Sequence, residues 1–154
     1  MRVLVWIVEE TWQATAAAAA ALLPADADVT LLYVRAGDAE AVARGARYAL
    51  LGRPHRSATE ALGTMSEQSA RQLLADAQAA LGRDAVLDVR SGRIEHEVVA
   101  AAETMDLLAF ARDKDHTHPG PHSLGPTGRY VLDHAPCAVL LIWPDAPSGS
   151  TSPA

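Results

Sequence analysis

Short apolar runs recur along the chain, and stretches with helical spacing separate them. Most of these runs are continuous rather than alternating, which is typical of strands covered on both faces in a parallel sheet. Strands that alternate with helices predict an α/β domain, because each strand then reaches its parallel neighbour through a helical crossover. The expected strands are residues 3–8, 29–34, 85–89, 106–111 and 137–143.

Helices are expected between these strands, because capping residues flank their apolar faces. The most regular one follows Thr64 and Glu67, which have capping-box spacing, and stops at Gly82. The other expected elements are helices at 12–21 with Thr11 as N-cap, at 38–51, at 94–103 and from 123–127 to 134, a loop at 53–63 and a turn at 91–92.

Composition favours one soluble domain that does not bind nucleic acid. The chain has 13 Lys and Arg against 19 Asp and Glu, a net charge of −6, so its field repels phosphate backbones and anionic membranes. No apolar run has the length of a membrane span or the pattern of a secretory signal. We expect a cytoplasmic protein with one domain at 1–143 and a disordered tail at 144–154, which has three prolines and three serines.

The segment after the fourth expected strand carries most of the functional information. Residues 106–111 lead into a polar loop at 112–122, and Gly125 and Pro126 then open a helix. In open parallel sheets such loops bind anions and nucleotides, because the unpaired N–H groups and the dipole of the helix face them. We therefore expect the functional site at this edge of the sheet.

The end of the chain carries a specific sequence pattern. Gly125-Pro126 opens the last helix, and the segment Val131-Leu132-Asp133-His134-Ala135-Pro136-Cys137 leads to the last apolar strand. This pattern resembles the universal stress protein family, in which a Gly-Ser/Thr pair opens the last helix before a Val-Leu-x-His-Ala-Pro-Cys segment. Residues 2–5, Gly92 and residues 106–108 also match, so the resemblance covers residues 2–143. It implies a Rossmann-like domain with a five-stranded parallel sheet of order 3-2-1-4-5 and helices on both faces.

Nucleotide-binding members of this family carry an Asp at the end of the first strand and a Gly-x2-Gly-x9-Gly-Ser/Thr loop. Val8 stands at the Asp position here, with Glu9 and Glu10 next to it. Pro126 stands where the family has a hydroxyl residue, so an O–H and a backbone N–H that could meet a phosphate are both missing.

The first two glycines of the loop motif are also missing. Counting back from Gly125 places Arg112 and Asp115 at these positions, and counting forward from the strand places Ala111 and Lys114 there. The positions that the resemblance puts next to a ligand are Val8, Glu9, Val34, Ala111, Arg112, Gly125, Pro126 and Thr127.

These departures predict a degenerate nucleotide loop, with no cofactor or only weak binding of ATP or AMP. The alternative is an ATP- or AMP-binding member with a rebuilt phosphate loop, in which Arg112, Lys114 and Arg129 replace the lost amides. For Gly125 and Pro126 themselves, a plain helix start is the favoured interpretation over an anion site, because proline is common at the first helical position.

Two polar groups of the loop have competing interpretations. Arg112 could reach a ligand phosphate, but an ion pair with Glu9 or Glu10 across the neighbouring strand is favoured. A metal site could be formed by His116, His118 and His122 with Asp113 and Asp115, but solvated loop side chains are favoured because none has helical i, i+4 spacing. No metal or catalytic residue is therefore assigned.

The apolar residues of the chain suggest further contacts. Trp6 is expected as a core aromatic rather than a plug at the mouth of the site, and Cys137 as a small packed hydrophobe. The last strand, from Cys137 to Trp143, has no charge that protects an exposed edge, which predicts a homodimer joined along it. The expected function is that of a stress-response regulatory or binding protein, not an enzyme, which acts as a dimer and through protein contacts.

Overall fold

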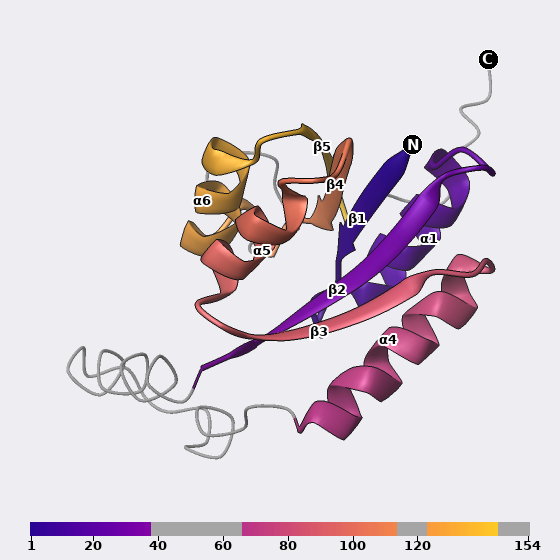
Figure 1. Ribbon diagram of the computed structural model, residues 1–154, viewed down its shortest axis with the longest axis horizontal. Helices are drawn as coiled ribbons and strands as arrows, with labels where there is room; N and C mark the ends of the chain where they lie inside the picture. The colour runs from indigo at the N-terminus through magenta and orange to yellow at the C-terminus, as the bar shows by residue number, and fades with distance from the viewer. Residues whose placement is uncertain (38–65, 114–122, 145–154) are drawn as a thin grey trace, which may run out of the picture.

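The computed structural model describes residues 1–37, 66–113 and 123–144. These residues form one sheet of five parallel strands in the order β3-β2-β1-β4-β5 (Figure 1). The predicted α/β class and the predicted strand order are thus confirmed. The elements in chain order are β1 Arg2–Trp6, α1 Trp12–Leu22, β2 Asp28–Ala36, α4 Glu67–Leu81, β3 Val86–Gly92, α5 Ile94–Ala102, β4 Leu107–Ala111, α6 Pro126–His134 and β5 Ala138–Ile142.

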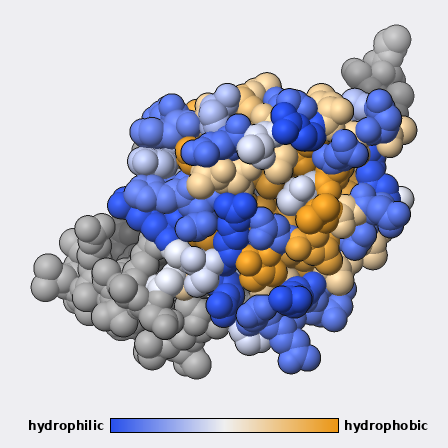
Figure 2. Space-filling view, viewed as in Figure 1, coloured by the Kyte–Doolittle hydropathy of each residue, from blue (hydrophilic) through white to orange (hydrophobic). Residues whose placement is uncertain are grey.

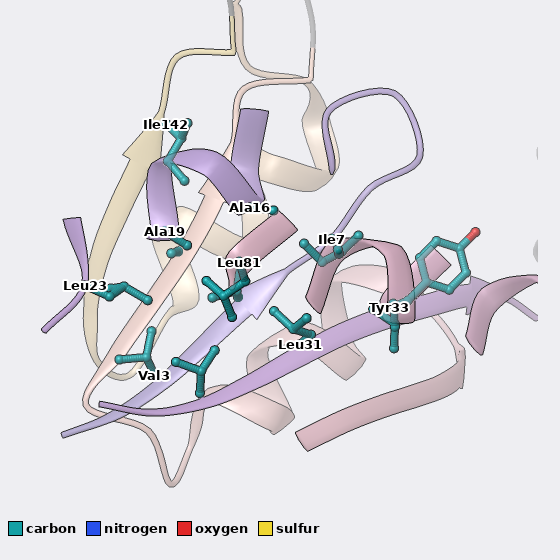
Figure 3. Packing of buried hydrophobic residues seen from close by; sticks show 14 of the residues in the cluster. Val3, Ile7, Ala16, Ala19, Leu23, Leu31, Tyr33, Leu81 and Ile142 are labelled. Atoms are coloured by element: carbon teal, nitrogen blue, oxygen red, sulfur yellow. The ribbon is translucent and has the colours of Figure 1, made fainter. Parts of the chain in front are cut away.

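Helices cover both faces of the sheet, and each face has its own core. The core under α1 and α4 contains Val3, Leu31 and Leu81, all buried (Figure 3). The core under α5 and α6 contains Leu4, Leu108 and Val131. Successive residues of β1 enter opposite cores, because side chains alternate across a strand. Since both faces are covered, the sequence of the central strand β4, LLAFA, is continuously apolar.

Two predicted helix caps differ from the structure. Thr11 precedes α1 but makes no side-chain cap, and its carbonyl accepts a hydrogen bond from the Thr15 hydroxyl at 2.9 Å. The α4 helix begins at Glu67 with Ser66 as N-cap, and Ser66 Oγ accepts from the Ser69 amide at 3.1 Å. The capping box predicted at Thr64 and Glu67 was therefore wrong, because Ser66 offers a cap immediately before the helical residues.

The turn predicted at residues 91–92 was also wrong. β3 continues through Ser91 and Gly92, which pair with Arg35 and Ala36 of β2. Gly92 then takes φ +154°, a conformation that favours glycine, and the chain turns directly into α5. The helix predicted at 38–51, the loop at 53–63 and most of the predicted tail lie outside the described residues.

The two edges of the sheet differ in charge. β3 has Asp88 and Arg90, which form an ion pair at 2.9 Å, and charged residues on an edge discourage pairing with another chain. β5 at the opposite edge has only apolar residues. Val86 and Leu87 of β3 are exposed, and Figure 2 shows hydrophobic residues in the middle of one face with hydrophilic residues around them. In the described residues no helix is both long and apolar enough to cross a membrane.

Candidate anion site at the carboxyl edge of the sheet

The carboxyl ends of β1 and β4 lie side by side in the middle of the sheet. The crossover from β1 passes through α1 on one face, whereas that from β4 passes through α6 on the other. Crevices outside such a switch point are the usual ligand sites of open α/β sheets. This position agrees with the edge that the sequence indicated.

The candidate residues at this edge of the sheet differ widely in their exposure to solvent. Val34 and Ala111 each keep only 4% of their surface and belong to the two cores. Val8 is half-buried against the α5/α6 core, and Glu9 is exposed. A ligand at this edge would therefore meet polar side chains and backbone, not Val34 or Ala111 side chains.

Glu9 forms a hydrogen bond with Tyr33 on the neighbouring strand β2. The Tyr33 hydroxyl, at the end of the α1/α4 core, donates to Glu9 Oε1 at 2.6 Å. In Figure 3 the Tyr33 hydroxyl points away from the labelled aliphatic side chains. Burial, and then the hydrogen bond to the Glu9 carboxylate, raises the pKa of Tyr33 well above its ordinary value. A neutral Tyr33 thus remains a donor throughout the physiological pH range.

Arg112 contacts residues at the ends of β5 and α6 instead of Glu9 or Glu10. Its Nη1 group donates to the buried Ser123 hydroxyl. The guanidinium carbon lies 5.3 Å from the centre of the Trp143 ring, within range of a cation–π contact. The ion pair that the sequence favoured for Arg112 is therefore wrong. The physical reason is that Glu9 accepts from Tyr33 on β2, while Arg112 follows β4 and lies towards β5.

The N-terminus of α6 holds a carboxylate from the same chain. Gly125 is the N-cap residue and Pro126 the first helical residue, which confirms the predicted helix start. The Gly125 amide donates to Asp113 Oδ1 at 2.7 Å. A carboxylate is well placed there, because the helix dipole favours negative charge at the N-terminus. Thr127 lies half-buried in the first turn of the same helix.

The remaining sequence hypotheses concern Trp6, Cys137 and the histidines. Trp6 is 6% exposed and its ring centre lies 5.3 Å from that of Phe110, so it is a core aromatic as predicted. Cys137 packs against the α5/α6 core, and burial raises the pKa of its thiol. The histidine cluster of the loop lies outside the described residues.

Sequence reasoning missed four residues of this edge: Asp113 as the partner of Gly125, Tyr33 as the partner of Glu9, and Ser123 and Trp143 as the contacts of Arg112. Tyr33 and Trp143 could have been found from the strand order. Tyr33 lies on β2, next to the strand β1 that Glu9 follows, and Trp143 follows β5, next to the strand β4 that Arg112 follows. Asp113 has no such signal, since no local motif links it to a residue twelve positions away.

The parallel sheet with helices on both faces defines a doubly wound α/β protein. Proteins of this class bind ligands at the carboxyl ends of strands and at helix N-termini. The sequence profile described as the Universal stress protein family matches residues 1–142. The chain belongs to the universal stress protein family, as the sequence resemblance implied. No curated protein sequence matches it.

Solved structures with the same fold span nearly the whole chain. The universal stress protein UspA from Lactobacillus plantarum has 19% identity and a TM-score of 0.56 over 92% of this chain and 97% of that one. A universal stress protein from Archaeoglobus fulgidus has 18% identity and a TM-score of 0.55 over 92% and 98%. A universal stress protein in complex with cAMP has 16% identity and a TM-score of 0.54 over 94% and 97%. At these identities the likeness concerns the fold.

Proposed function

We propose that this protein is a non-enzymatic, cytoplasmic regulatory member of the universal stress family, whose nucleotide loop is degenerate and which acts as a homodimer through protein contacts. One observation carries the proposal: the Gly125 amide, the last glycine of the family's loop motif, donates to the chain's own Asp113 carboxylate. The next residue, Pro126, has no N–H to offer a phosphate.

The residues at the end of β1 also disfavour a nucleotide. Val8 stands where nucleotide-binding relatives carry a carboxylate, and its side chain packs against the α5/α6 core. Glu9 adds negative charge near any triphosphate at this edge, partly screened by salt. Each missing charge-assisted hydrogen bond is worth ~1.5–3 kcal/mol, so two or three of them weaken binding by roughly two to six powers of ten.

Titration of the purified protein with Mg-ATP tests this proposal. We expect a dissociation constant weaker than the micromolar range, because the amide, hydroxyl and carboxylate contacts of the family motif are missing. Isothermal calorimetry at fixed ionic strength measures it, with Mg-AMP as the matched ligand of lower charge. A micromolar or tighter constant for ATP would contradict the degenerate loop.

A second candidate function is an ATP- or AMP-binding protein with a rebuilt loop. Arg112 favours it, since a guanidinium stands at the edge of the sheet between Ser123 and Trp143, and guanidinium groups bind phosphates well. A relative of the same fold is known in complex with cAMP. The calorimetric titration distinguishes the two proposed functions, because only the ATP- or AMP-binding function predicts tight binding of Mg-ATP.

The proposed dimer uses the β5 edge. Ala138–Ile142 is entirely apolar, whereas β3 at the other edge has an ion pair between Asp88 and Arg90. An uncharged edge offers unpaired N–H and C=O groups to a second strand. A two-fold pairing of β5 with its own copy would satisfy both edges.

Leu141→Lys tests this interface. We expect the wild-type protein to scatter light with about twice the 16.2 kDa mass of one chain, and the variant to approach the mass of a monomer, because a desolvated charge in the interface is costly. Leu132→Lys on α6 is the control, since Leu132 is 40% exposed and lies outside the β5 strand. An unchanged mass for a folded Leu141→Lys variant means that the interface is elsewhere.

A further inference from the structure

Arg35 has a buried nitrogen atom without a hydrogen-bond partner. Among the described residues, its Nε atom is the only buried side-chain nitrogen or oxygen of this kind. The guanidinium also forms no salt bridge within residues 1–37, 66–113 and 123–144. A buried N–H without an acceptor costs free energy, and such groups are rare in native proteins. An acceptor that binds from outside the chain would explain it.

Arg35 stands at the carboxyl end of β2, on the face of the sheet that α1 and α4 cover. Side chains alternate along a strand, so Arg35 shares this face with Leu31 and Tyr33, which belong to the α1/α4 core. On β3 its neighbour is Ser91, which is exposed. This part of the edge lies on the other side of β1 from β4, which Arg112 follows.

The Glu9 carboxylate provides an acceptor close to this cation. Glu9 is exposed, and its Oε1 atom accepts the Tyr33 hydroxyl at 2.6 Å. Arg35 lies two residues after Tyr33, and its positive charge opposes the rise in the Tyr33 pKa that burial and Glu9 cause. Both charges thus act on the same hydroxyl. A carboxylate has about four lone pairs, so the hydrogen bond from Tyr33 leaves Glu9 able to accept from a further donor.

The charges around Arg35 disfavour a phosphate ligand. Glu9 and Glu10 both act on Tyr33, and the pKa of Glu67 is lowered chiefly by its hydrogen bond to Arg71 and in smaller part by Arg35. Glu67 is held by Arg71 at 2.7 Å, so it does not neutralise Arg35. A multiply charged anion would be repelled by these carboxylates. A ligand with one carboxylate and one ammonium group would bring no net charge.

We propose that Arg35 and Glu9 bind a zwitterionic small molecule of the α-amino acid class, with the guanidinium on its carboxylate and Glu9 on its ammonium group. A planar guanidinium matches a carboxylate with two parallel N–H donors. Such a ligand supplies the acceptor that the buried Nε atom lacks, and the Tyr33 hydroxyl holds the Glu9 carboxylate towards β2. The inference goes beyond the proposed function, since it concerns another ligand class and the ends of other strands.

The Nε–H group of Arg35 reports on this site directly. Glycine is titrated into 15N-labelled full-length protein at fixed pH and ionic strength, and the Nε–H signal, assigned by its absence in Arg35→Lys, is followed by NMR. We expect a saturable shift in the millimolar range of glycine. Acetate should bind about tenfold or more weakly, because it lacks the charge-assisted hydrogen bond of the ammonium group. Inorganic phosphate should bind more weakly than glycine.

Glu9→Gln separates the two halves of the ligand. Its neutral amide still offers an oxygen to the Tyr33 hydroxyl, but it has lost the charge that attracts an ammonium group. We expect glycine to bind about tenfold or more weakly to this variant, while acetate binds no more weakly than to the wild type.

Arg35→Gln removes the guanidinium, and the Ser91 backbone amide on the neighbouring strand then serves as the reporter. We expect its response to glycine to be lost, and Arg35→Lys, which keeps the charge but not the planar donors, to retain a weaker one. Arg2→Gln is the matched control, because it removes the same charge from an exposed arginine at the amino end of β1. This control should bind glycine as the wild type does.

Four results would overturn the inference. They are an Arg35 Nε–H signal that glycine does not shift, a tighter response to phosphate than to glycine, unchanged glycine binding in Glu9→Gln, and an equal loss in Arg2→Gln and Arg35→Gln. If Arg35→Gln failed to fold, the comparison of glycine with acetate in the wild type and in Glu9→Gln would still decide.

Discussion

Phe110→Ala is expected to lower the free energy of unfolding by about 3–5 kcal/mol. Phe110 is 1% exposed in β4 and its ring centre lies 5.3 Å from that of Trp6. Its Cε2 atom also lies 3.5 Å from the point where a Cβ atom would stand on Gly128 of α6. The side chain therefore joins the sheet to α6, and its removal leaves a cavity between layers that pack tightly on both sides.

Urea unfolding at one fixed protein concentration measures this loss, because dimer formation would make stability depend on concentration. Leu132→Ala is the matched control: Leu132 is 40% exposed on α6, so we expect a change within about 0.5 kcal/mol. If Phe110→Ala lost less than about 1.5 kcal/mol, the layers would have closed over the cavity, and the rigid contact between β4 and α6 would be wrong.

The fold could be predicted because its signals are local and redundant. The apolar run that became β1 reads as a strand from its own residues, and burial on both faces explains why it does not alternate. Where one polar residue decided an outcome, the prediction failed. Ser66 rather than Thr64 caps α4, and Ser91 continues β3 instead of turning.

The sequence indicates at which edge of the sheet the candidate site lies, but not which of its side chains contact one another. Strand order alone places Glu9 and Arg112 at one edge, since carboxyl ends of parallel strands meet there. Which groups form hydrogen bonds depends on side-chain orientations that are set only in the folded structure. The Tyr33 hydroxyl on β2 donates a hydrogen bond to Glu9, and Arg112 contacts Ser123 and Trp143 instead.

Restoring three positions of the family motif is expected to raise the affinity for Mg-ATP by roughly two to four powers of ten, since two regained charge-assisted hydrogen bonds are worth about 1.5–3 kcal/mol each. The variant combines Val8→Asp, Arg112→Gly and Pro126→Ser. The introduced serine would return an N–H and a hydroxyl to the start of α6, and the introduced glycine would allow the backbone to approach a phosphate. Calorimetry against the unaltered protein measures the gain.

Replacing Pro126→Ser by Pro126→Ala in the same triple variant separates the two groups that proline lacks. Alanine regains the N–H but not the hydroxyl, so we expect an intermediate affinity. If neither variant gains affinity, the missing motif is not the barrier. The groups that remain at this edge are then responsible, foremost the Asp113 carboxylate on the Gly125 amide and the Glu9 carboxylate held by Tyr33. Adding Asp113→Ala to the triple variant distinguishes these two, because it frees the amide and leaves the Tyr33–Glu9 hydrogen bond intact.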